Sequence, residues 1–161
     1  MKQTDIENYS RDDSKEFDLI CELEKALNDE WLAYYQYWTA YTIATGSGRY
    51  DAVPEFKEHA DEEWSHIEEL SKRIMELEGN ITLDPSKLRS EAHDWSPVSS
   101  CETLDLIKDL KHAELGAIKI YKDLITCMCD KDPVTKTLLI NILAKEEEHY
   151  HDLELLCGSV I

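Results

Sequence analysis

The sequence predicts an all-α protein, a four-helix bundle in which the second and third helices run parallel to each other. Three observations predict it. Apolar residues recur at helical spacing in four long segments, no segment alternates apolar and polar residues as a β-strand would, and the connections between the four segments differ in length. With 161 residues, of which 42% are apolar, the chain is long enough to form one domain with a substantial core.

The first two helices are defined by apolar stripes that end at glycines. The first stripe spans residues 17–41 and stops at the turn 46–48, which contains two glycines. The second stripe spans residues 53–77 and stops at Gly79, because a glycine directly after a helical pattern is a common C-terminal signal. The short turn between the two stripes makes these helices antiparallel neighbours.

The third and fourth helices follow a long connection. Their stripes span residues 104–128 and 139–156, and Pro133 with the charged residues before it separates them. Each of the four helices would have roughly 24–30 residues, which is long for a globular protein. The connection between the second and third helices, about residues 80–101, is long enough to bring the chain back to the end where the second helix began. The predicted topology is therefore up-down-down-up with a long crossover.

The charge of the chain narrows the classes of partner. Asp and Glu number 35 against 17 Lys and Arg, a formal net charge of −18, which argues against nucleic acid and against an anionic membrane surface as partners. The longest uncharged stretch, residues 31–48, is too polar to span a membrane.

We expect an acidic tail without a basic arm at residues 1–14, and one domain at residues 15–158. The first residues contain no apolar run, so we expect no secretory signal and a cytoplasmic location.

Each apolar stripe is interrupted by an acidic residue at a position where the helical repeat calls for an apolar one. The first and third stripes each have a lone glutamate, and the second and fourth each have a glutamate followed three residues later by a histidine. These residues are Glu30, Glu114, Glu63 with His66, and Glu146 with His149. Glu148 and His151 have the same spacing, but at 100° per residue they lie on the solvent side of the fourth helix. Four carboxylates and two imidazoles therefore point at the middle of the core.

The six groups together predict a site for two metal ions. A single glutamate or histidine in an apolar stripe usually reaches solvent or is satisfied within the core, but four buried carboxylates would repel one another, and each desolvated charge would cost several kcal/mol. Two divalent cations bring four positive charges and remove both penalties. Oxygen-rich ligands with one imidazole per metal favour iron or manganese over structural zinc, and this ligand pattern is known from di-iron and di-manganese bundles.

With these residues in place, the chain resembles the ferritin-like superfamily, and bacterioferritins most closely in its site. The resemblance covers about residues 15–157. It is carried by three segments: Leu27-Asn28-Asp29-Glu30 with Gln36-Tyr37, His66 with Leu77-Glu78-Gly79, and Glu146-Glu147-Glu148-His149 with Leu153-Glu154. Spacings of 33 residues from Glu30 to Glu63 and 32 from Glu114 to Glu146 agree with it. The resemblance implies that the six residues are metal ligands, with Glu63 and Glu146 as the bridges.

Two tyrosines extend the resemblance. Tyr37 matches a first-helix tyrosine near the metals that can take part in electron transfer, which would make it a catalytic residue. Tyr121 lies at the same seven-residue offset from Glu114 as Tyr37 does from Glu30, so it repeats the pattern in the second half of the chain. Ordinary core packing is the other interpretation of both tyrosines.

Three departures from bacterioferritins shape the expected assembly. Trp64 stands where bacterioferritins have their haem-binding methionine, so we expect no haem. Twelve residues follow His149, too few for the fifth helix that closes 24-subunit ferritins. The crossover is longer, and there are extra cysteines. Together these features resemble the Dps-like dodecamers called thioferritins, which keep a bacterioferritin-type site inside each subunit, so we expect a homo-oligomer of twelve chains.

The resemblance implies a ferroxidase that oxidises Fe(II) with O2 or H2O2 at two iron ions per subunit, manganese being the alternative metal, and that stores the ferric product. The rival interpretation is a di-iron or di-manganese peroxidase or catalase that stores nothing. A DNA-compacting role lacks support because the tail has no basic arm.

The helix geometry allows Cys21 to pair with Cys127 or Cys129, and Cys101 with Cys157, with reduced thiols as the other interpretation.

Overall fold

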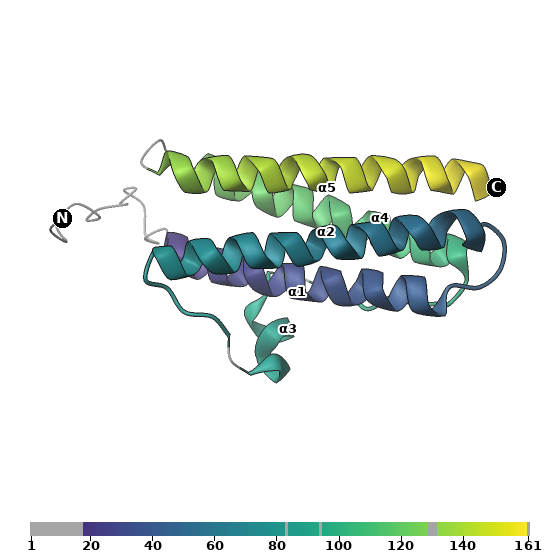
Figure 1. Ribbon diagram of the computed structural model, residues 1–161, viewed down its shortest axis with the longest axis horizontal. Coiled ribbons are helices and arrows are strands. Elements are labelled where there is room, and N and C mark those ends of the chain that lie inside the picture. Colours follow the sequence, from purple (N-terminus) through teal and green to yellow (C-terminus); the bar gives the residue numbers. More distant parts are fainter. Residues whose placement is uncertain (1–17, 83, 94, 129–131, 161) are drawn as a thin grey trace, which may run out of the picture.

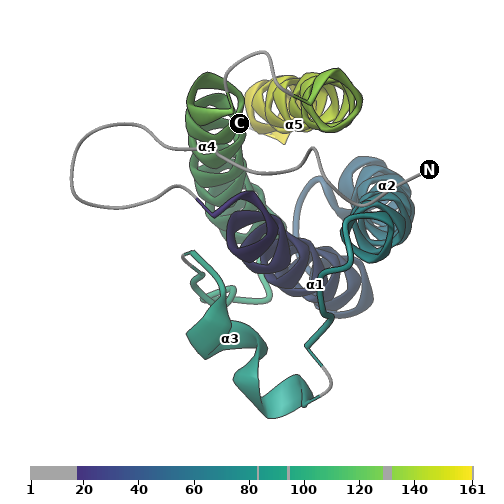
Figure 2. The same ribbon diagram turned by 90° about the vertical axis from the view of Figure 1, so that its left-hand side faces the viewer.

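The computed structural model describes residues 18–82, 84–93, 95–128 and 132–160, and across these residues it is helical with no strand. Four long helices form a bundle (Figures 1 and 2): α1 Leu19–Ile43, α2 Arg49–Glu76, α4 Thr103–Cys127 and α5 Pro133–Val160. They have 25 or 28 residues each, as predicted. The expected acidic tail at residues 1–14 lies outside the described residues.

The direction of the four helices confirms the predicted topology. In Figure 1, α1 and α5 run from left to right, while α2 and α4 run from right to left. The crossover leaves the left end of α2, passes outside α1 and returns to the right end, where α4 begins. The bundle is therefore up-down-down-up, with α2 and α4 parallel.

Two aspartates start helices at the same end of the bundle. Asp18 accepts a hydrogen bond from the backbone N–H of Cys21 at 3.2 Å, and Asp132 accepts one from the backbone N–H of Thr135 at 3.0 Å. Both side chains thus satisfy N–H groups that have no partner inside the first turn of a helix. Asp132 also accepts a hydrogen bond from the Arg73 guanidinium at 2.8 Å, which ties the start of α5 to α2.

Gly79 ends α2 for a reason that the sequence pattern did not predict. The residue in the left-handed conformation is Glu78, with φ 62°, and the Gly79 N–H donates to the Ile74 carbonyl at 2.9 Å. A Cβ on Gly79 would lie 2.6 Å from the Ile20 side chain and 2.8 Å from that of Ile74. The glycine is therefore needed for the close approach of this segment to α1.

The crossover packs along the outside of α1. It contains two short helical elements, η1 Pro85–Lys87 and α3 Leu88–Glu91, which Figure 2 shows on the outer side of α1. His93 fixes it by donating its backbone N–H to Asp29 at 2.9 Å and by placing its ring Nδ1 2.5 Å from the same carboxylate. Gln36 donates its side-chain amide to the Ser96 carbonyl. The crossover is thus held beside the stretch of α1 that carries Glu30.

Two apolar clusters stabilise the bundle, one toward each end. The first contains Leu23, Leu27, Leu70, Leu124 and Leu139, and the second contains Ala40, Phe56, Leu106, Leu110 and Leu153. On every helix the predicted acidic position falls between the residues of the two clusters, so a polar layer crosses the middle of the core. None of the described helices is both long and apolar enough to cross a membrane.

Candidate metal centre

The six predicted side chains meet in this polar layer. Each is at most 4% exposed. They form two groups of four, and within each group the candidate ligand atoms all lie within 4.8 Å of one another. The groups are Glu30, Glu63, His66 and Glu146, and Glu63, Glu114, Glu146 and His149. Glu63 and Glu146 belong to both groups, the arrangement that two bridging carboxylates require.

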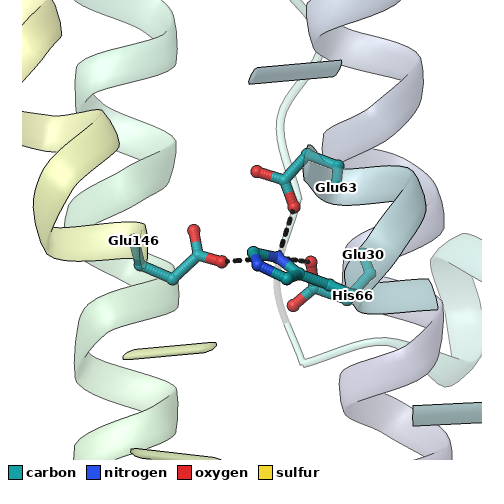
Figure 3. Close-up of side chains that lie close together, drawn as sticks. All are labelled: Glu30, Glu63, His66 and Glu146. Carbon is teal, nitrogen blue, oxygen red and sulfur yellow. Dashed lines mark hydrogen bonds and ion pairs between the residues drawn. The ribbon is translucent and has the colours of Figure 1, made fainter. Parts of the chain in front are cut away.

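The first group surrounds one imidazole nitrogen. The Nδ1 atom of His66 lies 3.3 Å from Glu30, 3.3 Å from Glu63 and 3.1 Å from Glu146. Figure 3 shows Glu63 and His66 on α2 beside Glu30 on α1, while Glu146 reaches toward them from α5 on the opposite side. Three carboxylates therefore converge on a point where a positive charge stabilises all of them.

The second group is built in the same way and has an additional acidic contact. The Nδ1 atom of His149 lies 3.2 Å from Glu63, 3.6 Å from Glu114 and 3.8 Å from Glu146. Its other nitrogen, Nε2, lies 2.7 Å from Glu62. A carboxylate on the outer nitrogen fixes the orientation of a metal-binding imidazole and increases its basicity. Sequence reasoning missed Glu62, although its position directly before Glu63 placed it at the edge of the same helix face.

The two predicted tyrosines both contact carboxylates of the centre. Tyr37 on α1 donates its hydroxyl to Glu114 on α4, and Tyr121 on α4 donates its hydroxyl to Glu30 on α1. Both side chains are at most 2% exposed. Each tyrosine thus crosses to the carboxylate of the other half, which ordinary apolar packing does not require. The role of Tyr37 in electron transfer stays a prediction.

Burial and mutual repulsion control the protonation of the carboxylates. Burial, together with the charge of Glu63, raises the pKa of Glu30 to about 8. Burial and the charges of Glu63 and Glu114 raise the pKa of Glu146 well above its ordinary value. Burial also disfavours the charged form of Glu63, but the adjacent imidazoles of His149 and His66 outweigh it and hold the pKa of Glu63 well below its ordinary value.

The two histidines respond in the opposite sense. Burial disfavours the charged form of His66 and His149, yet the surrounding carboxylates outweigh burial and raise the pKa of both. The centre therefore attracts positive charge strongly enough to retain protons on groups that would otherwise release them. Divalent cations can replace those protons.

Three buried polar atoms in the centre make ion-pair contacts but no hydrogen bond, and they test whether metal ions fit. They are Glu63 Oε1, Glu146 Oε1 and His149 Nδ1. A buried polar atom without a hydrogen bond costs free energy, and three such atoms close together are unusual in a core that serves packing alone. All three carry lone pairs that a cation can accept. The donor set, four carboxylates and two imidazoles, fits two divalent ions of the iron or manganese type.

A cavity of about 460 Å³ opens onto the centre between α1 and α4. Its inner wall contains Glu30, Tyr37, Glu114 and Tyr121, and crossover residues 95–97 line it as well. The cavity has room for small molecules next to the carboxylates and next to the hydroxyl groups of both tyrosines. The sequence pattern contained no signal for it, because it depends on how the crossover packs against two helices.

His59 is the second residue that sequence reasoning missed. It is 2% exposed, and its ring stacks on that of His149 with centroids 4.1 Å apart. Burial, with the charge of His149, lowers the pKa of His59 to about 4. The available signal was its position four residues before Glu63, one turn earlier on the same face. Glu148 and His151 are exposed, as the helical phase predicted.

The cysteines of the described residues are not paired. Cys21, Cys101, Cys127 and Cys157 are all free, so neither the pairing of Cys21 with Cys127 nor that of Cys101 with Cys157 is formed. Cys129 lies outside the described residues. Cys21 and Cys101 are exposed, and Cys127 and Cys157 are partly buried.

The chain is similar to known proteins over most of its length. The sequence profile of the ferritin-like domain matches residues 20–160. The DNA protection during starvation protein of Pyrococcus furiosus is 31% identical over 137 residues, which cover 79% of this chain and 70% of that protein. The structure of a dodecameric thioferritin, the bacterioferritin-related protein of Bacteroides fragilis, is 37% identical with a TM-score of 0.85 and covers 88% of this chain and 85% of its own. Dps from Thermosynechococcus elongatus, at 18% identity and a TM-score of 0.79 over 84% of this chain and 87% of its own, shares the fold.

Proposed function

The chain belongs to the ferritin-like domain family, and we propose that it is a ferroxidase that oxidises Fe(II) with O2 or H2O2 and stores the ferric product. The observation that carries the proposal is the pair of buried four-residue groups that share Glu63 and Glu146. Four carboxylate charges balance two Fe(II) ions, and the oxygen and nitrogen atoms that lack hydrogen bonds would supply lone pairs for them. Two metal ions per subunit is part of the proposal, with manganese as the alternative metal.

Each ligand has a proposed task. Glu63 and Glu146 would be shared by the two ions, Glu30 and His66 would hold one of them, and Glu114 and His149 would hold the other. Holding both ions at bridging distance lets one oxidant molecule accept one electron from each of them. With peroxide the balance is two Fe(II), one H2O2 and two protons giving two Fe(III) and two H2O. With O2, two Fe(II) and two protons give two Fe(III) and one H2O2.

Tyr37 is proposed to assist this electron transfer as the catalytic residue. Its hydroxyl donates to Glu114, and its ring packs edge-on against His59 at 5.1 Å and against His149 at 6.0 Å. The tyrosine is therefore in contact with a ligand carboxylate and next to a ligand imidazole. The phenol would act as a relay: it would lose an electron to the oxidant as its proton moves to Glu114, and an electron from Fe(II) would reduce it again as the proton returns, so both balances are unchanged.

The proposed assembly is a homo-oligomer of twelve chains. In each chain the domain would span residues 15–158, after an acidic tail at residues 1–14. The thioferritin of Bacteroides fragilis, 37% identical, is dodecameric. An acidic surface favours the entry of Fe(II), and we propose a cytoplasmic protein with neither nucleic acid nor a membrane as partner. Trp64, whose ring packs against Trp31 at 5.5 Å and Tyr34 at 5.7 Å, leaves no thioether at that position to bind a haem.

The test compares Fe(II) oxidation by the full chain and by the double variant Glu30→Ala, Glu146→Ala. We expect oxidation at least about 100-fold slower in the variant, because each ion loses a ligand and one bridge is removed. Glu69→Gln, an exposed carboxylate on α2, is the control and should oxidise Fe(II) at the normal rate. Circular dichroism checks that all chains are folded. Unchanged oxidation in the double variant would exclude this function.

Native mass spectrometry after iron loading separates storage from the rival peroxidase or catalase activity, which uses the same centre. Twelve chains that hold many irons each would support storage. Two metal ions per chain and no more, with turnover of peroxide, would support the non-storing enzyme.

A further inference from the structure

A second cluster of metal-binding side chains lies beside the centre, between α2 and α5. It consists of Glu55, His59 and Asp152, whose candidate ligand atoms all lie within 4.8 Å of one another. His59 is buried, while the two carboxylates are 40% and 36% exposed. The cluster therefore connects the surface of the α2–α5 face to a buried imidazole.

The contacts of His59 are too long for hydrogen bonds. Its Nε2 atom lies 3.9 Å from Glu55 and 3.8 Å from Asp152, and its Nδ1 atom is buried without a hydrogen-bond partner. A buried imidazole without hydrogen bonds costs free energy. A cation about 2.1 Å from each ligand atom holds those atoms roughly 3–4 Å apart, and the distances from His59 Nε2 to the two carboxylates are in this range.

The internal repeat of the bundle shows that this histidine is not needed for packing. Glu63 and His66 are each 83 positions before Glu146 and His149. At the same offset, His59 corresponds to Ile142, which is 1% exposed in the first apolar cluster. The fold thus accepts an apolar side chain at the equivalent position.

The two carboxylates of the cluster also differ from the residues at the equivalent positions in the other half of the bundle. Glu55 corresponds to Leu138, and Asp152 corresponds to Glu69. Of the three positions, only that of Asp152 is acidic in both halves. A complete imidazole and carboxylate set therefore exists on one side of the bundle alone.

We propose that Glu55, His59 and Asp152 bind a third divalent cation, and that cations pass from this site to the buried centre. The His59 ring stacks on His149 at 4.1 Å, with 22° between the planes, so the site adjoins a proposed ligand directly. Glu62, three residues after His59 on α2, contacts His149 at 2.7 Å and is partly exposed. The transfer step depends on the proposed ferroxidase function, whereas the binding site does not.

The binding site is tested with Co(II) alone, by anomalous diffraction from crystals of the full chain. We expect a peak between Glu55, His59 and Asp152 in addition to peaks in the centre. The double variant Glu55→Gln, Asp152→Asn should lose this peak and keep those of the centre, since it leaves the His59 stack intact. Glu69→Gln is the matched control because it alters the equivalent of Asp152, and it should keep every peak.

The outcomes separate the two proposals. Peaks in the centre without one at His59 would overturn the third site and leave the ferroxidase proposal standing. A peak at His59 with none in the centre would support the third site and exclude the proposed function.

The transfer step is tested by the initial rate of Fe(II) oxidation at limiting Fe(II). We expect Glu55→Gln, Asp152→Asn to be about tenfold slower, with the same amount oxidised per chain at saturating Fe(II). Glu68→Gln, Glu69→Gln removes two charges from the same helix and should show a normal rate. An equal rate in all three chains would overturn the transfer step.

Discussion

His66 and His149 occupy equivalent positions in the two halves of the bundle, α1–α2 and α4–α5, but their surroundings differ. The outer nitrogen of His149 contacts Glu62, and His59 covers its ring. The positions equivalent to Glu62 and His59 in the other half are Lys145 and Ile142. The ligands of the centre are therefore duplicated, while the groups that orient them and connect them to the surface exist on one side only.

Removing a shared ligand should have the largest effect, because it affects both halves. We expect Glu63→Ala to weaken the binding of both ions by about 100-fold or more, whereas Glu30→Ala and Glu114→Ala should each weaken one ion. Titration with Co(II), followed by native mass spectrometry, counts the ions per chain. If Glu30→Ala also lost both ions, Glu30 would not act on one ion alone and the division of the centre into two four-residue groups would be wrong.

The pH dependence tests what the halves have in common. The pKa of Glu30, ordinarily 4.5, is raised to about 8, and the pKa values of His66 and His149 are raised as well. Between the ordinary and the raised pKa the folded chain holds protons that the unfolded chain has released, so without cations its free energy of unfolding falls as pH rises through this window.

Cations displace those protons, so the stabilisation they provide should grow with pH. We expect metal affinity to rise about tenfold per pH unit for each displaced proton between pH 5.5 and 7.5. The measurement is the rise in melting temperature on adding Mn(II) at each pH. A rise that is constant across this range would show that the centre does not exchange protons for cations.

Glu62→Gln should separate the two halves. The change weakens the acceptor on His149 Nε2 and leaves His66 unaffected, so one ion should bind about tenfold more weakly and the other normally. Lys145→Gln is the comparison, since it changes the equivalent residue and an ion-pair partner of Glu62. Two-site fits of Co(II) titrations give both affinities. An equal loss of affinity for both ions would mean that Glu62 acts through its negative charge on the whole centre and not through its contact with His149.

The smallest expected effect is the difference in oxidation rate between variants of the two tyrosines. Tyr37→Phe and Tyr121→Phe each remove one hydroxyl that donates to a ligand carboxylate. We expect both to alter metal affinity by similar factors, but only Tyr37→Phe to slow oxidation further, about fivefold to tenfold, because only Tyr37 packs against His59 and His149. Stopped-flow oxidation kinetics measure the difference. Equal rates in the two variants would remove the catalytic role from Tyr37.

The sequence was sufficient to predict the helices and the six residues of the centre, because both depend on periodicity within one helix. Glu146 and Glu148 could be separated by phase alone. The crossed contacts of Tyr37 and Tyr121 depend on how α1 and α4 are rotated against each other, which no single stripe encodes. Gly79 was predicted as a stop from its position directly after the helical pattern, but contact with Ile20 is what requires a glycine there.

The features that sequence reasoning missed share one property: each needs a partner from another element. His59 gains its significance from Asp152 on α5, and Glu62 gains its significance from His149. The crossover was predicted as a connection only, whereas its docking on α1 depends on His93 and Asp29, which are 64 positions apart.

The distribution of helix contacts has a consequence for the order of folding. Most interhelical contacts lie within the pairs α1–α2 and α4–α5, each a local hairpin with a small cost of loop closure. These hairpins can form early and independently, each carrying two of the four buried glutamates. The two pairs of glutamates approach each other only when the hairpins dock, so electrostatic repulsion between the pairs opposes that late step. The cations that the mature protein handles would then also act as its folding catalysts, by lowering the barrier to docking.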